Sequence, residues 1–233
     1  MPTQGSRAIE ARLINDGLRL NLRDCRHGVN WNGTLLNDVD RCIAQMNQML
    51  KKRNKKPLSG ISDYHKACCF PIIEYYKNVG FDFAEEPFED LADEFIKLYQ
   101  SAEIGDMKLY DNSEYVLKTV QDSQISQIIL SATDQDNLNT QTAPFRIKQY
   151  FDEILGIADI YANSKVEIGL EYLRRNNVQN GIMIGDSIHD FEMSKAMGIK
   201  CALVAHGHQS KSTLQSCNAP ILNNLNEVLD YIL

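Results

Sequence analysis

Two different spacings of apolar side chains divide this chain of 233 residues. Between residues 38 and 104, apolar side chains recur every three to four positions, which is the spacing of an amphipathic helix. The predicted helices are 38–50, 63–79 with an interruption near Pro71, and 87–99. We therefore expect this part of the chain to consist of helices alone.

After residue 105 the pattern changes to short apolar runs that alternate with helical stretches. The predicted strands are 125–130, 153–157, 181–184 and 201–204, and the predicted helices are 113–122, 138–150, 165–175 and 188–197. This alternation is typical of a parallel sheet with crossover helices. A further strand candidate, 27–31, is unusually polar and contains Gly28, which weakens a strand interior.

The order of these elements predicts how the chain is divided. One predicted strand precedes the helical residues and four follow them, which favours an insertion over two domains in series. We expect a helical domain, 38–104, inserted into an α/β core formed by 25–37 and 105–233. Residues 1–24 precede both parts as an extension to which the sequence assigns no role.

Composition and charge restrict the class of protein. Hydrophobic residues make up 43% and charged residues 24% of the chain, which is ordinary for a soluble globular protein. The net charge of −7 argues against nucleic acid as a partner, because binding a phosphate backbone needs a basic face. No apolar run approaches the ~20 residues of a membrane span, and the N-terminus lacks the apolar core of a signal peptide. We therefore expect no membrane partner, and no pattern indicates an oligomeric state.

The cysteines favour a reducing compartment. The six cysteines are scattered, and no two of them form a CxxC pair. Their spacing therefore predicts neither a zinc site nor a disulfide framework. Cys42, Cys68 and Cys201 stand among apolar neighbours, where we expect small core residues. Free thiols of this kind suit the cytoplasm, which we predict as the location.

Candidate chemistry begins at the predicted strand 181–184. It is followed at once by Gly185 and Asp186, and Asp190 lies in the first turn of the next predicted helix. Open α/β sheets bind ligands at the carboxyl ends of their strands, and two carboxylates there suit a hard cation such as Mg²⁺. The structural alternative is that Asp186 caps the helix and Asp190 stabilises its dipole.

Three more polar segments fall at or near predicted strand ends. They are Asn30-Trp31-Asn32-Gly33-Thr34, Ser131-Ala132-Thr133 and Lys165. Together with Gly185–Asp190, their order and spacing resemble the motifs of the haloacid dehalogenase-like (HAD) phosphohydrolases, in particular the phosphoglycolate phosphatase-like branch, over residues 26–233. The resemblance implies an α/β fold with a Rossmann-like parallel-sheet core and an inserted all-helical cap domain. It also implies Mg²⁺ as cofactor and a small phosphorylated metabolite as substrate.

The resemblance also implies a role for each position. Position 30 corresponds to the nucleophile that forms an aspartyl-phosphate, and position 32 to the general acid and base. Mg²⁺ would be held by residue 30, by the backbone carbonyl of residue 32 and by Asp186. Asp190 would orient water bound to the metal.

The remaining matched positions would bind the phosphoryl group. Gly33, Thr34, Ser131 and Ala132 would contribute hydroxyl and backbone N–H donors, and Lys165 would neutralise charge on the nucleophile and the phosphate. The structural alternatives are a Ser131 that only ends a strand and a solvated Lys165 in the first turn of a helix. His206 and His208 follow the last predicted strand and could suggest a transition metal. We expect a polar loop there instead, with His189 pointing away from the metal. The aromatic residues of 64–99 are expected to pack helices, and some of them to face the cleft.

One departure from the family pattern affects activity most. Positions 30 and 32 are Asn, where the family has Asp. A carboxamide is a poor nucleophile, and loss of a nucleophile typically costs on the order of 10⁴- to 10⁶-fold in rate. Natural loss of activity and a deliberate near-isosteric replacement both explain Asn30. Deamidation at Asn32–Gly33 would restore a carboxylate at position 32 only.

These residues leave three functions open. The first is a Mg²⁺-dependent phosphatase that is weak or inactive with Asn30. The second is a non-catalytic protein that binds a phosphorylated ligand or regulates a partner through Thr34, Ser131 and Lys165. The third is a 2-haloacid dehalogenase, which ranks last because that chemistry also needs Asp at position 30 and does not require Asp186 or Asp190.

Overall fold

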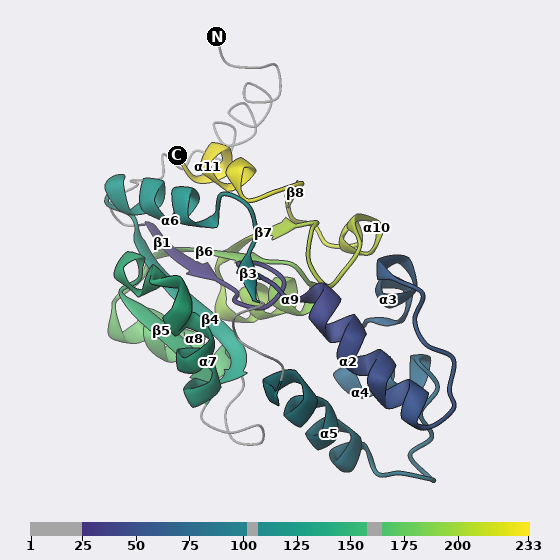
Figure 1. The fold of residues 1–233 in the computed structure, drawn as a ribbon. Coiled ribbons are helices and arrows are strands. Elements are labelled where there is room, and N and C mark those ends of the chain that lie inside the picture. The colour runs from purple at the N-terminus through teal and green to yellow at the C-terminus, as the bar shows by residue number, and fades with distance from the viewer. Residues whose placement is uncertain (1–24, 102–106, 158–164) are drawn as a thin grey trace.

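The computed structural model describes residues 25–101, 107–157 and 165–233, so the extension 1–24 lies outside the described residues. Six strands form one parallel sheet in the order β5-β4-β1-β6-β7-β8 (Figure 1). The strands are β1 Cys25–Val29, β4 Ser126–Asp134, β5 Glu153–Ile157, β6 Asn180–Gly185, β7 Lys200–Val204 and β8 Ile221–Leu222. The predicted α/β class with a parallel sheet is confirmed.

Helices cover both faces of this sheet, because side chains alternate along each buried strand. Ile129 and Ile184 belong to a hydrophobic cluster with α6 (Ser113–Asp122) and α11 (Asn226–Ile232). Ile128 and Met183 point the other way, into a cluster with α8 (Lys165–Arg175) and α9 (Ile188–Met197). The smaller elements of this part are α7 Gln135–Thr142, η3 Ala143–Phe145, η4 Ile147–Tyr150 and α10 Lys211–Leu214.

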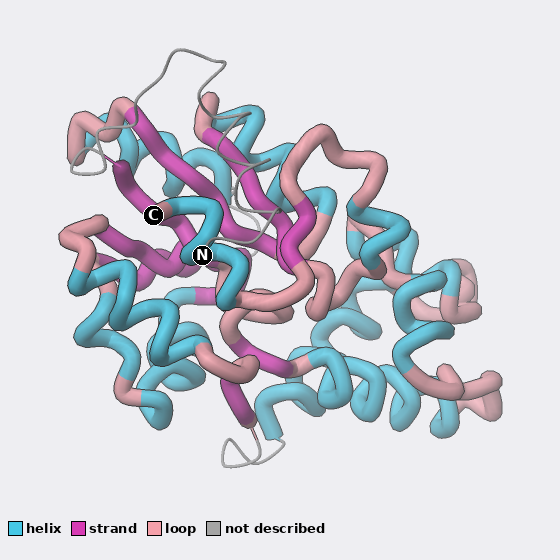
Figure 2. The backbone as a smooth tube through the Cα atoms, turned by 90° about the horizontal axis from the view of Figure 1, so that it is seen from above, coloured by secondary structure: helices cyan, strands magenta, loops and turns pink. Residues whose placement is uncertain are grey.

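Four helices follow one another between the short strands β2 (Leu36–Asn37) and β3 (Lys108–Leu109), which pair antiparallel. They are α2 Val39–Lys52, α3 Ile61–Ala67, α4 Ile72–Asn78 and α5 Phe88–Ser101. Figures 1 and 2 show this group beside the sheet and not on either of its faces. Its buried side chains, among them Met49 and Leu91, form a hydrophobic cluster of their own. Among the described residues, no helix is long and apolar enough to cross a membrane.

Most predicted elements occur at or near the expected bounds, and α6, α8 and α9 agree residue for residue. One prediction was wrong. The single helix expected over 138–150 is α7 followed by two 3₁₀ turns. Pro144 lacks a backbone N–H and ends the helix, while Asp134 caps it earlier by accepting hydrogen bonds from the backbone N–H groups of Asp136 and Asn137.

The polar first strand β1 lies at the centre of the sheet, between β4 and β6. Gly28 fits there because a Cβ atom at this position would approach Met183 Sδ to 3.2 Å. His27 is 1% exposed, and its Nε2 has no hydrogen-bond partner among the residues described. Burial lowers the pKa of His27 to about 4, so the ring is neutral near pH 7. Sheet pairing on both sides therefore outweighs the poor strand propensity of this segment.

Candidate active site

The predicted site residues meet around one cavity of about 650 Å³ at the carboxyl ends of β1, β4 and β6. The predicted residues that line it are Asn30, Asn32, Ser131, Ala132, Lys165, Asp186 and Asp190. Helices α2 to α5 form the opposite wall. This is the position at which open α/β sheets bind ligands.

The loop after β1 turns sharply so that residues 30 and 32 reach the cavity. The backbone N–H groups of Leu35 and Leu36 donate to the carbonyl of Trp31, whose indole is fully buried. The indole Nε1 donates to Gln141 Oε1 at 2.8 Å and so fixes the loop from beneath. Gly33 has a φ of +70°, and a Cβ atom there would come within 2.3 Å of Asp186 Oδ2, so this position requires glycine.

Asn30 is held by three groups at once. Its Oδ1 accepts a hydrogen bond from Lys165 Nζ at 3.0 Å. Its Nδ2 donates to Asp186 Oδ1 at 3.3 Å and to the backbone carbonyl of Asn32 at 3.1 Å. Turning the amide over would set its NH₂ group against the ammonium of Lys165 and its oxygen against two acceptors. The hydrogen bonds therefore fix the orientation of this carboxamide.

A buried ion pair lies behind Asn30. Lys165 Nζ contacts Asp190 Oδ1 at 2.8 Å, and the two residues are 4% and 1% exposed. Asp190 Oδ2 also accepts hydrogen bonds from Ser187 Oγ and from the backbone N–H of Asp186. Burial raises the pKa of Asp190, but the effects of Lys165 and Ser187 lower it by a larger amount. The pKa of Asp190 therefore lies below its usual value. Asp190 is thus a carboxylate that orients Lys165.

Asp186 differs from Asp190 in that its pKa is raised. Burial and the nearby charge of Asp190 raise its pKa, and the opposing effects of His208 and Thr34 are smaller. Thr34 is fully buried and donates its hydroxyl to Asp186 Oδ1 at 2.8 Å. Gly33 donates its backbone N–H to Asp38 Oδ1 at 2.9 Å. Thr34 and Gly33 therefore support the acids from behind, whereas the sequence predicted them among the substrate-binding groups.

The segment after the buried part of β4 meets the first loop directly. Ser131 Oγ accepts the backbone N–H of Thr133 at 3.1 Å, and Thr133 Oγ1 donates to Asn32 Oδ1 at 2.8 Å. Asn32 Nδ2 in turn donates to Asp38 Oδ2 at 2.8 Å. Thr133, for which the sequence predicted no separate role, thus orients one of the two Asn side chains of the site.

Asp38 is the functional residue that sequence reasoning missed most clearly. It stands directly before α2, is 2% exposed, and accepts hydrogen bonds from Gly33, Asn32 and Tyr99. Its Oδ1 lies 3.3 Å from His208 Nε2. Burial raises the pKa of Asp38, but His208 and the hydrogen bonds lower it more, so the carboxyl group is ionised. An acid at the start of a helix is so common that no signal of this role was visible in the sequence.

The two histidines after β7 are more than a polar loop. His208 also lines the cavity, and its backbone N–H donates to Asp186 Oδ2 at 2.8 Å. Burial alone would lower its pKa, yet Asp38 and Asp186 raise it to about 9. His206 lies against the Tyr110 ring and within 3.1 Å of the Thr34 carbonyl. His189 lines the cavity as well and stacks on Phe70.

The helical wall of the cavity is mainly aromatic and aliphatic. The apolar residues that α3, α4, α5 and the connection between α3 and α4 contribute are Tyr64, Cys68, Phe70, Ile72, Tyr75, Tyr76, Phe95, Ile96 and Tyr99. Some of the aromatic residues predicted to pack helices therefore face the cleft. Cys42, predicted as a core residue, is half-buried and also lines the cavity.

The donor atoms implied for Mg²⁺ can be compared with this geometry. Asp186 Oδ1 and the Asn32 carbonyl both converge on one atom, which is the amide nitrogen Nδ2 of Asn30. The only oxygen of the Asn30 side chain faces Lys165 instead. A nitrogen that donates hydrogen bonds cannot coordinate a cation. In this arrangement the residues present do not fit the ion, because the amide of Asn30 binds the oxygens that the ion would need.

Comparisons with known proteins concern the family and the fold. The family model of the haloacid dehalogenase-like hydrolases matches residues 32–204, so the match begins at Asn32 and leaves Asn30 outside. No curated protein matches the sequence.

Solved structures with the same fold are distant in sequence. A haloacid dehalogenase-like family hydrolase from Streptococcus pneumoniae is 17% identical with a TM-score of 0.75, over 89% of this chain and 98% of that one. A predicted phosphoglycolate phosphatase from Haemophilus somnus is 16% identical with a TM-score of 0.71, over 89% and 97%. Protein Tyrosine Kinase A from Mycobacterium tuberculosis is 17% identical with a TM-score of 0.75, again over 89% and 97%. At such identities the likeness shows the fold alone.

Proposed function

This chain belongs to the haloacid dehalogenase-like hydrolase family, and we propose that its cleft binds a small phosphorylated metabolite but hydrolyses it weakly or not at all. The observation that carries this proposal is the position of Asn30 between Lys165 and Asp186. In the family this position attacks phosphorus. Here the carboxamide is a poor nucleophile whose oxygen is already bound by Lys165.

The roles of this chain's residues follow from their contacts. Lys165 would place its positive charge beside the phosphoryl group, with its direction fixed by Asp190. Ser131 and the backbone around Ala132 would donate to phosphoryl oxygens at the end of β4. Asn32, held by Thr133 and Asp38, would contact the ester oxygen but would not exchange a proton with it.

Metal dependence is part of the proposal only for a restored site. Mg²⁺ supplies charge neutralisation for the phosphoryl group in phosphatases of this kind. With Asn30 the amide opposes the ion, whereas an aspartate in its place would offer a carboxylate oxygen beside Asp186 and the Asn32 carbonyl. We therefore expect binding of Mg²⁺ to be weak in this chain and to strengthen in Asn30→Asp.

The helical wall provides the basis for a proposal about the organic part of the substrate. We propose that residues 38–104 act as a cap domain that selects the substrate, because they form their own core and supply the apolar wall of the cavity. A volume of about 650 Å³ is large for a two-carbon phosphate ester. The aromatic lining favours a phosphorylated compound that carries a planar or hydrophobic group.

The test is an assay of the chain, Asn30→Asp and Asn30→Asp/Asn32→Asp on aromatic and aliphatic phosphomonoesters, with and without Mg²⁺. The restored variants should release phosphate only with Mg²⁺, and aromatic esters should react faster than polyol phosphates. Asn137→Asp is the matched control, because it adds the same charge at a different residue of the cavity wall. Restored variants that stay silent on every ester and bind no phosphate would refute the proposal.

A second function is favoured by the charges of the site. Asn30 removes one negative charge from a group that otherwise contains Lys165, Asp186 and Asp190. A phosphorylated ligand would therefore meet less repulsion here without a metal than in a site with aspartate at position 30. Calorimetry with phosphate and aromatic phosphate esters in excess chelator distinguishes this binding protein from a weak phosphatase, since binding without turnover supports it.

The proposal includes a cytoplasmic location. The cysteines among the described residues, Cys42, Cys68, Cys69, Cys201 and Cys217, are all free thiols. Free thiols are the usual state in a reducing compartment.

A further inference from the structure

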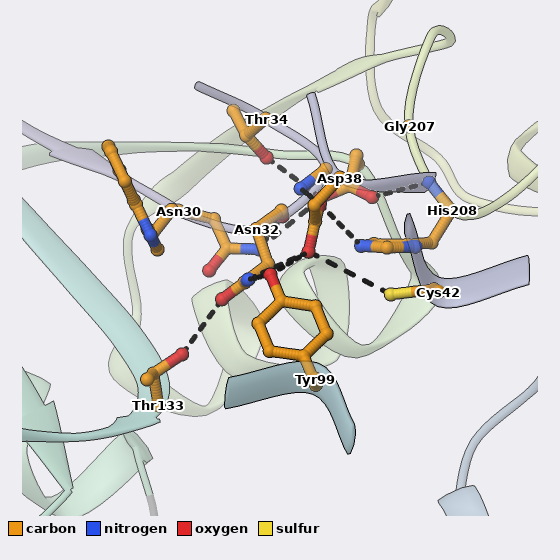
Figure 3. Close-up of polar contacts among 12 residues, drawn as sticks. Asn30, Asn32, Thr34, Asp38, Cys42, Tyr99, Thr133, Gly207 and His208 are labelled. Carbon is orange, nitrogen blue, oxygen red and sulfur yellow. Dashed lines mark hydrogen bonds and ion pairs between the residues drawn. The ribbon is translucent and has the colours of Figure 1, made fainter. Parts of the chain in front are cut away.

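Three side chains of different chemistry meet on the cavity wall beside the site described above. Asp38 precedes α2, Cys42 lies one helical turn further on, and His208 comes from the loop after β7 (Figure 3). His208 Nε2 lies 3.3 Å from Asp38 Oδ1, and Cys42 Sγ lies 3.9 Å from Asp38 Oδ2. One oxygen, one sulfur and one nitrogen of these residues all lie within 4.8 Å of one another.

We propose that Asp38, Cys42 and His208 form a site for a transition-metal ion, with Zn²⁺ as the best match. A carboxylate, a thiolate and an imidazole are the three ligand types that zinc takes in proteins, whereas Mg²⁺ prefers oxygen alone. Tetrahedral zinc with normal bond lengths holds such ligand atoms roughly 3.3–3.6 Å apart. The contacts of 3.3 Å and 3.9 Å involve different oxygens of Asp38, and the three ligand atoms lie within 4.8 Å of one another, so side-chain shifts of about 1 Å complete the site.

The ion would take the place of hydrogen atoms that now lie between Asp38, Cys42 and His208. The Cys42 thiol donates to Asp38, and Nε2 of His208 faces the same carboxylate. An ion among the three ligand atoms would replace both hydrogens: the thiol proton and the proton on His208 Nε2 would both pass to solvent, and the ring would keep only its proton on Nδ1. That nitrogen lies 2.8 Å from the Tyr64 hydroxyl, which would accept this proton's hydrogen bond and fix the ring. The sulfur–metal and nitrogen–metal bonds thus form with no redox partner.

The hydrogen-bond donors around Asp38 resemble those that orient a metal ligand. Its carboxylate is oriented by the backbone of Gly33 and by the side chains of Asn32 and Tyr99. Such partners around a ligand typically account for 10- to 100-fold in metal affinity. A salt bridge between Asp38 and His208 with Cys42 as filler is the simpler interpretation, but it does not explain why the thiol points at a carboxylate.

The ion would keep a position open toward the ligand. Asp38, Cys42 and His208 all line the cavity, and three protein ligands leave a fourth tetrahedral position free. A phosphate or carboxylate oxygen of the bound molecule could occupy it. The site would then help to hold the ligand on the side of the cavity where α2 begins. This inference does not depend on hydrolysis, because it concerns residues outside the Asn30–Lys165–Asp186 group.

The experiment is a titration of the chelator-treated full chain with Co²⁺, followed by absorption spectroscopy and by competition with Zn²⁺. We expect a thiolate-to-cobalt charge-transfer band that saturates at one equivalent and disappears when Zn²⁺ is added. Excess Mg²⁺ should leave it unchanged. Cys42→Ser should abolish the band, and His208→Gln should weaken Zn²⁺ binding by more than the roughly 10- to 100-fold expected for an outer partner such as Tyr64→Phe.

Two control variants separate this site from other thiols. Cys69→Ser removes a thiol that contacts Asn78 elsewhere in the helical part, and Cys68→Ser removes one that lines the same cavity. Both should keep the band. A band that persists in Cys42→Ser, or an unaltered chain without any band, would overturn the proposal.

A measurement on the unaltered chain covers the case in which Cys42→Ser does not fold. Zn²⁺ should protect Cys42 from alkylation, whereas Cys69 should react equally fast with and without the ion. Mass spectrometry of the two peptides gives both rates. Equal alkylation of Cys42 in the presence and absence of Zn²⁺ would contradict the site.

Discussion

The two walls of the cavity differ in chemistry and in how the chain builds them. The core wall is polar, and its side chains are bound to one another across large separations in sequence, such as the 135 positions between Asn30 and Lys165. The helical wall is mainly apolar and comes from one continuous stretch of chain between α2 and α5. The core wall therefore depends on correct assembly of the sheet, while the helical wall depends on local helix packing.

Under the proposed function, this difference separates the groups for reaction from those for substrate selection. Groups such as Lys165 and Asp190 satisfy each other's hydrogen bonds and have little freedom to adapt to a ligand. Aromatic side chains such as Tyr76 and Phe95 offer area without a fixed hydrogen-bond pattern. Changes in the core wall should alter rates and stability strongly, and matched changes in the helical wall should alter them little, except at Tyr99, whose hydroxyl binds Asp38.

The largest expected effect is on the rate of hydrolysis. Asn30→Asp should raise phosphate release in the presence of Mg²⁺ by on the order of 10⁴-fold or more, because it restores the nucleophile and frees Asp186 from the amide. Initial rates on an aromatic phosphomonoester measure this. Tyr76→Phe on the helical wall is the counterpart and should leave the rate of that variant within a few-fold. A large rate in the unaltered chain would contradict the comparison.

The second effect concerns the stability of the core wall. Lys165→Met leaves Asp190 buried without its cation, which should lower the free energy of unfolding by about 3–5 kcal/mol. Urea unfolding followed by the fluorescence of Trp31, the one tryptophan of the chain, reports this. Lys118→Met breaks an exposed pair with Asp122 and should leave the free energy of unfolding nearly unchanged, because solvent screens such a pair. Similar losses of stability in the two variants would show that the buried Lys165–Asp190 pair stabilises the fold no more than an exposed pair does.

A third effect appears as the pH is lowered. The pKa of His27 is about 4 in the fold and near 6.5 when unfolded, so between these values the unfolded chain binds more protons. His27 therefore contributes stability that is complete above pH 6.5 and is lost as the pH falls toward 4. The loss should be on the order of 3 kcal/mol across this window. In His27→Leu the stability measured by Trp31 fluorescence should depend less on pH, and an unchanged slope would exclude His27 as the cause.

The smallest expected effect is the change in stability when a single hydroxyl oxygen is removed from one of two tyrosines. Tyr99 and Tyr75 both line the cavity from the helical side, but only the Tyr99 hydroxyl reaches Asp38, at 2.8 Å. The Tyr75 hydroxyl is buried and has no hydrogen-bond partner within the described part of the chain. Tyr99→Phe should cost about 1.5–3 kcal/mol, and Tyr75→Phe should be neutral or slightly stabilising. Thermal unfolding of both variants measures this, and equal shifts would mean that the bond to Asp38 adds nothing.

What the sequence predicted well is what short-range patterns determine. The helices α6 and α8 follow from apolar periodicity, and Asp186 stands out because it directly follows a buried strand, with Asp190 four residues later. The order of the motifs predicted that Asn30, Ser131 and Lys165 share one pocket, and all three line the cavity. The roles proposed for them remain to be measured.

What the sequence did not predict depends on contacts between distant segments. Asp38 looks like any acid before a helix until the loop after β7 brings His208 to it. Tyr99 joins the same group only because α5 returns along α2. The orientation of the Asn30 amide is set by Lys165 and Asp186 together, so no local pattern contains it.

The central place of β1 has a consequence for how the protein forms during translation. Arg26 pairs with Ser126 on one side and with Gly181 on the other, so both neighbours of the strand lie 100 or more positions downstream. At ribosomal rates of about 5–20 residues per second, this strand waits on the order of ten to thirty seconds for its second partner. The helices α2 to α5, whose contacts are local, can assemble in the meantime. A nascent chain would thus present the folded helices α2 to α5 before the cavity beside them exists.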